Sequence, residues 1–118
     1  VEIALDGSAN SEFVAGRFIS GPGGAPDFAF GASVATGGRS IIAMPSAAAG
    51  GTISKVVNRL THGAPTTLPN YLADVIATEF GAVELRGKTL TERSELLIGI
   101  AHPDHRESLE RAFVSGDV

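Results

Sequence analysis

Two short apolar runs constrain the fold of this chain more than any other feature. The residues from Ile41 to Met44 and from Val75 to Ala77 are continuously hydrophobic and do not alternate with polar ones. A short continuous run is typical of a strand covered on both faces, as in a parallel sheet. Parallel strands need long crossover connections, usually helices, that lie on the faces of the sheet. The two runs therefore predict strands flanked by helices.

Three segments carry the signals of such helices: Pro26 to Val34, Leu90 to Ala101, and Pro103 to Phe113. Thr89 and Glu92 have the spacing of a capping box at the start of the second segment. The second helix should end at His102, because a residue before proline is disfavoured in the α conformation. His102 itself is expected to cap the third helix. Residues 45–52 and 61–70 are rich in small residues, glycine or proline and are predicted to be loops.

Alternating strands and helices predict an α/β domain with a Rossmann-like open, mostly parallel sheet flanked by helices. In such a sheet the ligand crevice lies at the carboxyl ends of the strands. The 118 residues amount to one domain at most. Because the segment from Val1 to Leu5 already has the pattern of a strand, we expect residues 1–118 to be a partial domain, cut from a longer protein.

Charge and composition exclude several classes of partner. The formal net charge is -4 and no cluster of Lys and Arg is present, which argues against nucleic acid or a membrane surface. The absence of cysteine excludes disulfides and thiolate metal sites. His62, His102 and His105 do not have the spacing of a metal site, so no metal is expected. Without an apolar run that could span a membrane, the chain is predicted to be soluble and cytoplasmic.

A glycine-rich loop from Ser20 to Phe28 precedes the first predicted helix. Gly21, Gly23 and Gly24 leave its backbone open to close approach by a ligand. The free N–H groups at a helix start favour an anion or a developing oxyanion. A simple turn into the helix would have the same composition. Asp27 is interpreted as a structural carboxylate that stabilises the helix dipole.

Five motifs follow one another in a recognisable order: Arg39 to Ser46, Gly50 to Val57, Val75 to Gly81, Glu84 to Lys88, and Ile100 to Arg106. Together they resemble the C-terminal part of the acetyl-CoA hydrolase/transferase family, which includes acetate and 4-hydroxybutyrate CoA-transferases. The resemblance covers nearly the whole chain. It implies that coenzyme A is a substrate, together with a small carboxylate, and that Gly21, Gly23 and Gly24 lie against the thioester.

The resemblance also bears on catalysis. In this family a nucleophilic glutamate forms an acyl anhydride and then a glutamyl-CoA thioester. That glutamate lies upstream of the matched region, so no catalytic nucleophile is expected in this chain, and Glu79 at the end of a strand is interpreted as a crevice-lining or structural carboxylate. Further expected crevice or CoA contacts are Ser46, Gly50, Gly51 and Lys55. Arg59, Arg86 and Lys88 are alternative phosphate contacts, although each has the character of a solvated surface charge.

One position departs from the family. Many members have a lysine just before the pair Gly50 and Gly51, where this chain has Ala49. Two hypotheses therefore stay open: part of a CoA-transferase or acyl-CoA hydrolase, or a non-catalytic domain for CoA binding or subunit assembly. As an enzyme segment, the chain is expected to be inactive alone, to need the rest of its protein and to belong to a homo-oligomer. The acyl group and the acceptor are not predicted.

Overall fold

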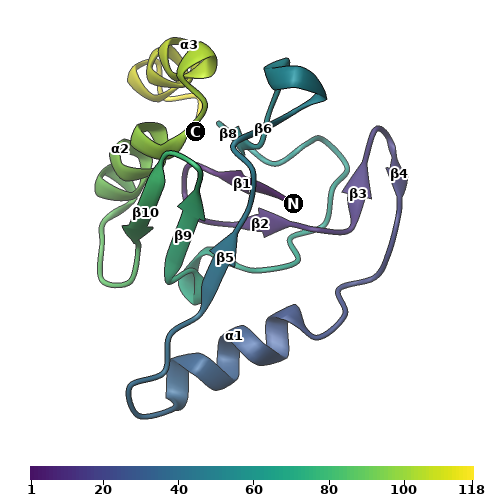
Figure 1. Ribbon diagram of the computed structural model, residues 1–118, viewed down its shortest axis with the longest axis vertical. Coiled ribbons are helices and arrows are strands. Elements are labelled where there is room, and N and C mark those ends of the chain that lie inside the picture. The colour runs from purple at the N-terminus through teal and green to yellow at the C-terminus, as the bar shows by residue number, and fades with distance from the viewer.

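The computed structural model describes all residues from 1 to 118 and shows an α/β arrangement of small sheets and three α-helices (Figure 1). One sheet has the order β2-β1-β8, with strands Glu2–Ala4 (β1), Ala9–Asn10 (β2) and Val56–Val57 (β8). A second has the order β10-β9-β5, with strands Ile41–Ala43 (β5), Val75–Thr78 (β9) and Gly81–Glu84 (β10). Two hairpins complete the sheets: Phe13–Val14 with Arg17–Phe18 (β3, β4) and Ala47–Ala48 with Ile53–Ser54 (β6, β7).

The predicted α/β class agrees with this structure, but the residues form no open, mostly parallel sheet of the Rossmann type. Only β1 with β8 and β5 with β9 run parallel, and the other strand pairs are antiparallel. The physical reason lies at Glu79 and Phe80, where the chain turns back after β9 instead of entering a crossover helix. Strand β10 then occupies the edge that another parallel strand would need.

The two apolar runs are strands, as predicted, yet they differ in burial. Ile76 in β9 is fully buried, whereas Ile41 in β5 is 64% exposed. Strand β5 is an edge of its sheet, with β9 as its only neighbour. The prediction that both runs are covered on two faces is therefore wrong for β5 within this chain.

The three predicted helices are present as Ala25–Val34 (α1), Leu90–Ile100 (α2) and Pro103–Val114 (α3). The capping box is confirmed: Thr89 Oγ1 accepts from the N–H of Glu92, and Glu92 accepts from the N–H of Thr89. His102 caps α3 by accepting the N–H of Asp104 on its Nδ1. Two short 3-10 helices are also present: Ala49–Gly51 (η1) lies in the predicted loop 45–52, and Asn70–Leu72 (η2) begins at the last residue of the predicted loop 61–70. No helix has the length and apolar character needed to cross a membrane.

The hydrophobic core lies between α2 and the two three-stranded sheets. Its fully buried side chains include Ile3 from β1, Ile76 from β9 and Leu97 from α2. Helix α1 stands apart at the bottom of Figure 1 and buries only Ala29. A hollow of about 330 Å³ lies between α1 and β5, and within these residues α1 is attached mainly through Ala29 and its contact with η2.

Candidate functional site

The predicted glycine loop is a fully exposed turn that leads into α1. Gly23 has a φ of +58°, a left-handed value that favours glycine, and no atom would meet a side chain placed there. Gly24 is the N-cap of α1 and offers no side chain to the free N–H groups of the first turn. Pro26 lies in that turn and Asp27 is its acidic residue, as the sequence indicated. The loop thus presents uncapped backbone N–H groups to the outside.

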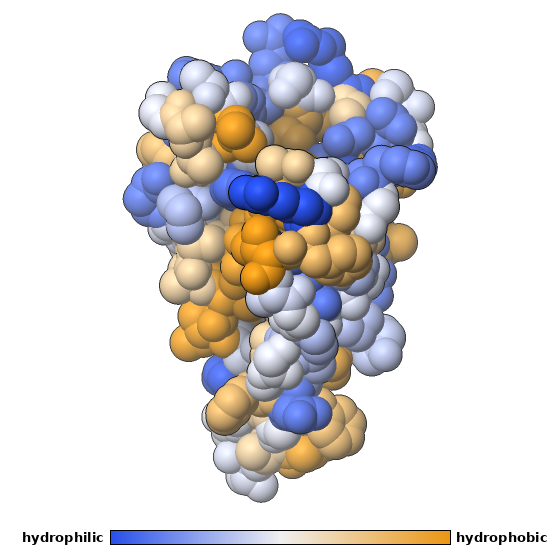
Figure 2. All heavy atoms as spheres, turned by 90° about the vertical axis from the view of Figure 1, so that its right-hand side faces the viewer, coloured by the Kyte–Doolittle hydropathy of each residue, from blue (hydrophilic) through white to orange (hydrophobic).

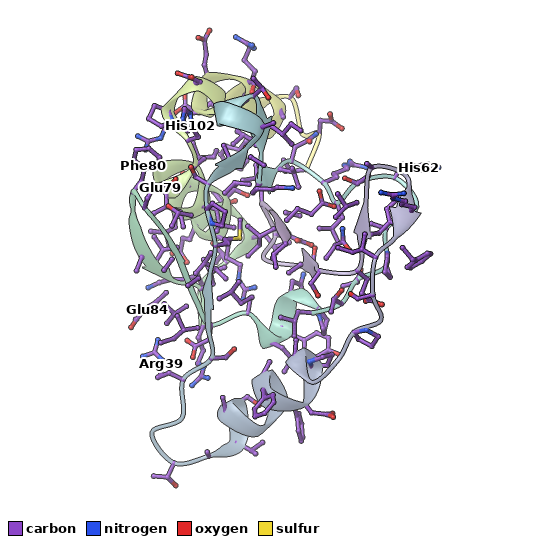
Figure 3. The ribbon with its side chains drawn as sticks, turned by 45° about the vertical axis from the view of Figure 1, so that its right-hand side comes forward. Arg39, His62, Glu79, Phe80, Glu84 and His102 are labelled. Carbon is purple, nitrogen blue, oxygen red and sulfur yellow. The ribbon has the colours of Figure 1, made fainter.

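A second group of residues surrounds the hairpin of β6 and β7. At the base of the hairpin, the N–H of Ser46 donates to Glu79 Oε1 over 2.7 Å. At its tip, the carbonyl oxygen of Gly51 lies 2.7 Å from Nε2 of His105. His102 lies beside this contact, with its ring 5.8 Å from that of His105. Glu79, Phe80 and His102 come together on one side of the molecule (Figure 3).

Glu79 is held in its ionised form. The backbone N–H of Ser46, followed by that of Glu79 itself, lowers the pKa of the Glu79 carboxyl. The hydroxyl of Ser46 is completely buried and has no hydrogen-bond partner. A carboxylate that accepts a backbone N–H is a fixed structural acceptor, so the contact gives Glu79 a structural role at the base of the hairpin.

The tip of the hairpin has an unusual backbone. Ala49, Gly50 and Gly51 have successive φ values of 51°, 67° and 93°. Two glycines adopt such values at little cost, whereas Ala49 is strained there. A Cβ on Gly51 would lie 3.4 Å from Nε2 of His102, which is an ordinary contact. Glycine at this position is therefore explained by its backbone conformation.

The structure divides the predicted site residues into two separate groups. In Figures 1 and 3 the hairpin tip lies at the top of the molecule, whereas α1 and the loop before it lie in the lower half. Ser46, Gly50, Gly51 and Glu79 belong to the hairpin group, and Gly21, Gly23 and Gly24 do not approach it.

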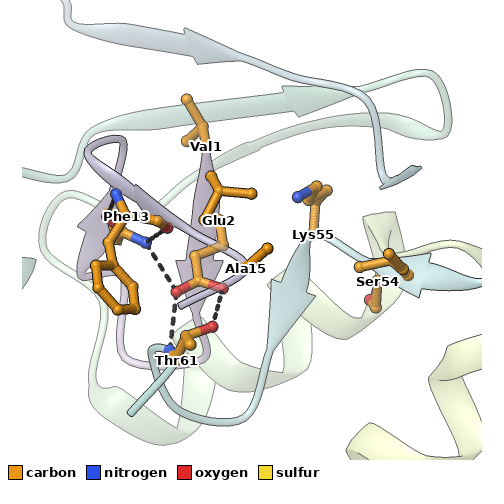
Figure 4. Close-up of a pocket in the computed structure, with 10 residues that line it drawn as sticks. Val1, Glu2, Phe13, Ala15, Ser54, Lys55 and Thr61 are labelled. Carbon is orange, nitrogen blue, oxygen red and sulfur yellow. Dashed lines mark hydrogen bonds between the residues drawn. The ribbon is translucent and has the colours of Figure 1, made fainter. Parts of the chain in front are cut away.

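Lys55 follows the hairpin, but its side chain lines a different hollow of about 300 Å³ (Figure 4). There Glu2 accepts hydrogen bonds from Asn10 and from Thr61. Lys55 and Glu2 give this hollow one charge of each sign. Ile53 and Ser54 of β7 also line this hollow, so it adjoins the hairpin, although Gly50 and Gly51 are not among its lining residues.

The alternative phosphate contacts are largely engaged within the chain. Arg59 lies 3.6 Å from Asp117, and Arg86 lies 3.0 Å from Asp74. Lys88 forms no ion pair. No group of three or more His, Asp or Glu side chains is arranged so that it could hold a metal ion.

Sequence reasoning missed the role of His105. It was considered only as a metal ligand, whereas the structure shows it in contact with the hairpin 54 residues earlier in the chain. It also missed the ion-pair cluster of Arg39, Asp74, Glu84 and Arg86. The apolar strand following Asp74 was a usable signal, because a carboxylate at the start of a buried strand needs a partner.

Comparisons with known proteins give the family that the motifs indicated. A model of the acetyl-CoA hydrolase/transferase C-terminal domain matches residues 1–113. The chain is 43% identical over 113 residues to 4-hydroxybutyrate coenzyme A transferase of Clostridium kluyveri, covering 96% of this chain and 26% of that protein. It is 40% identical over 114 residues to the succinyl-CoA:acetate/propanoyl-CoA:succinate CoA transferase of Fasciola hepatica, covering 95% of this chain and 24% of that protein.

Solved structures show the same relationship. RipA from Yersinia pestis superimposes with a TM-score of 0.89 at 45% identity, over 98% of this chain and 26% of RipA. The 4-hydroxybutyrate CoA-transferase of Porphyromonas gingivalis gives 0.67 at 42% identity, over 78% of this chain and 22% of that enzyme. The chain thus spans about a quarter of the length of the relatives that it matches. It belongs to the acetyl-CoA hydrolase/transferase family and corresponds to the C-terminal domain of that family.

Proposed function

We propose that residues 1–118 form the C-terminal segment of the catalytic domain of a CoA-transferase or acyl-CoA hydrolase. The whole protein would move CoA from an acyl-CoA to a small carboxylate through a glutamyl-CoA intermediate. The nucleophilic glutamate would lie outside these residues. The similarity to the two CoA transferases of Clostridium kluyveri and Fasciola hepatica supports this function. Its main structural support is the exposed, uncapped glycine loop at the start of α1.

The chemistry of the loop fits a thioester. When a glutamate attacks the thioester carbon, negative charge develops on the carbonyl oxygen, and an N–H group fixed near that oxygen stabilises the charge. Gly23 and Gly24 carry no side chain that would keep the oxygen away from the main chain. The positive end of the α1 dipole adds to the attraction. We assign the loop the role of oxyanion donor and leave nucleophilic attack to the remainder of the protein.

The exposed apolar surface supports a role for that remainder as the partner of this segment. Helix α1 exposes Phe28 to 80% and Phe30 to 60%, and β5 exposes Ile41 at the edge of its sheet. Hydrophobic residues gather in the middle and at the bottom of the face drawn in Figure 2. Exposed apolar patches and open strand edges favour association. We infer that other parts of the same protein cover α1 and extend the sheet beyond β5.

A non-catalytic CoA-binding or assembly domain is the second candidate, and Ala49 favours it. Related proteins often have a lysine before the two glycines, and a lysine there could contact a phosphate of CoA. In this chain the tip of the hairpin carries no cation at that position. A binding domain would retain affinity for CoA but lack turnover, whereas an enzyme would show both.

The test uses the full-length protein that contains this chain. CoA transfer from acetyl-CoA to a small carboxylate and hydrolysis of acetyl-CoA are measured for the wild type, for Gly23→Val and for Gly37→Val. Gly37 is the matched control, because its φ of +69° and its open surroundings resemble those of Gly23 at the other end of α1. We expect Gly23→Val to lower kcat/KM by about 100-fold, because a valine at this positive φ shifts the loop and keeps its N–H from the thioester oxygen, an effect on the scale of losing one oxyanion donor.

Gly37→Val should stay near the wild-type rate, since it adds the same local strain without touching the loop. Equal losses in both variants would exclude the oxyanion role of the loop. A wild-type protein that binds CoA, measured by calorimetry, but catalyses neither reaction would establish the second candidate instead.

A further inference from the structure

The hairpin of β6 and β7 depends on two side chains from elsewhere in the chain. Within the hairpin, Ala47 pairs with Ser54 and Ala48 with Ile53. From outside, Glu79 accepts the N–H of Ser46 at the base, and His105 contacts the carbonyl of Gly51 at the tip. A ladder of two residue pairs is too short to be stable alone. These two contacts are therefore in a position to determine where the tip lies.

The backbone of the tip increases its need for support. Three successive left-handed φ values, including that of Ala49, leave the isolated segment many competing conformations. Such a strained segment keeps one conformation only where its surroundings hold it. His105 in α3 restrains the tip through its hydrogen bond with the carbonyl oxygen of Gly51.

The direction of the bond between His105 and Gly51 follows from its acceptor. A carbonyl oxygen can only accept, so Nε2 of His105 carries the proton and donates it. The neighbouring His102 uses its Nδ1 to accept from the N–H of Asp104, which fixes the orientation of its ring. His102 in turn packs edge-on against His105 and against Phe80, both at 5.8 Å. The start of α3 thus presents a rigid pair of rings to the tip.

We propose that His105, with Glu79, is a positioning residue that fixes the glycine tip of the hairpin at Gly50 and Gly51 for binding of the CoA part of the substrate. This inference rests on the proposed function, because it assigns the tip to the CoA crevice. Neither side chain takes part in bond making. Without the hydrogen bonds of these two side chains, the tip samples other conformations, and only a fraction of the molecules bind acyl-CoA. The apparent affinity falls by that fraction while the chemical step is unchanged.

The experiment compares His105→Leu, His105→Gln and His62→Leu in the full-length protein. The amide nitrogen of Gln can take the place of Nε2 and donate to Gly51, whereas Leu keeps the bulk and cannot donate. His62, an exposed loop histidine remote from the hairpin, is the matched control. We expect His105→Leu to raise KM for acyl-CoA by about 10-fold, the effect of one hydrogen bond. KM for the carboxylate and kcat should change by less than about twofold.

His105→Gln should restore most of the affinity, and His62→Leu should match the wild type. An unchanged KM for acyl-CoA in His105→Leu, an equal effect of Leu and Gln, or a loss confined to kcat would each overturn the proposal. Hydrogen exchange at the Gly50 and Gly51 amides gives a readout that does not need turnover. Faster exchange in His105→Leu alone supports the positioning role even if the wild type lacks activity and the proposed function fails, and equal exchange refutes it.

Discussion

The substitution Asp74→Asn tests the ion-pair cluster that joins β5 to β9. The side chain of Asp74 is 1% exposed, and it accepts hydrogen bonds from Nε and Nη2 of Arg39 at 3.0 and 2.9 Å. It also accepts the N–H of Ser40 at 3.1 Å and lies 3.0 Å from Nη2 of Arg86. Burial disfavours the charge, but the bonds from Arg39 and Ser40 and the charge of Arg86 outweigh it and lower the pKa of Asp74.

The expected cost follows from the exposure of the partners. Removing one member of a buried ion pair costs about 3 to 5 kcal/mol when the other member is left buried. Here the side chains of Arg39 and Arg86 are 42% and 48% exposed, so water can solvate both guanidinium groups when the carboxylate is removed. The amide that replaces the carboxylate accepts through one oxygen and turns its NH₂ group toward arginine donors. We therefore expect a loss of about 2 kcal/mol.

Amide hydrogen exchange measures this loss where it occurs. The N–H of Val75, which donates to Ser40 over 3.0 Å, should exchange about 30-fold faster, since 1.4 kcal/mol corresponds to a factor of ten. Glu84→Gln is the control, because Glu84 also pairs with Arg39 but is 65% exposed and should contribute less than about 0.5 kcal/mol. Wild-type exchange at Val75 in Asp74→Asn would refute the reasoning.

The same cluster predicts a dependence on pH. A carboxyl whose pKa is lower in the folded state stabilises that state above its unfolded pKa, about 3.9 for Asp, and this contribution is lost as the pH falls through the folded value. The difference between the wild type and Asp74→Asn should therefore be largest near neutrality and should vanish in acid. A difference that grows as the pH falls would contradict the assignment.

Two further changes test the α2 region by urea unfolding. Thr89→Ala removes the acceptor of the capping box and should cost about 1 kcal/mol, with Thr89→Ser as a variant that retains it; equal stability of the Ala and Ser variants would contradict the cap. Leu97→Ala empties a fully buried core position and should cost about 3 kcal/mol, whereas Leu90→Ala, at an exposed position of the same helix, should cost less than about 1 kcal/mol; a reversed order would contradict the observed burial.

Local signals in the sequence predicted the helices well. The capping box at Thr89 and the proline after His102 act within a few residues, so their consequences can be read without knowledge of the rest of the fold. The apolar runs likewise predicted β5 and β9, because each run is a local feature of three or four successive residues. The order of the strands could not be read in this way, because it depends on whether the chain turns back after β9. The turn at Glu79 and Phe80 contains neither Pro nor Gly, although Gly81 follows it.

The candidate site was predictable in part. Family motifs led to Ser46, Gly51 and Glu79, and these residues do lie in one group around the hairpin. The motifs did not show that the glycine loop before α1 lies elsewhere, since motif order contains no distances. His105 was missed because its partner is a backbone carbonyl. Every residue has one, so the sequence does not indicate which carbonyl a side chain contacts. Residues 45–52 were predicted to be a loop from their small residues and glycines, but Ala47 and Ala48 form strand β6 because they pair with Ser54 and Ile53 across the hairpin.

The loose attachment of α1 has a consequence for how the glycine loop acquires its geometry. The loop takes its direction from α1, and within these residues that helix is anchored by Ala29 and by its contact with η2. The fraction of molecules with correctly oriented N–H groups is then set by the free energy with which α1 docks. A docking free energy of zero would leave half of the molecules competent, and about 1.4 kcal/mol would raise this share to roughly nine in ten. If the loop has the proposed oxyanion role, docking of α1 and binding of the thioester share one equilibrium, and a chain in which α1 is undocked is expected to expose the loop without acting on acyl-CoA.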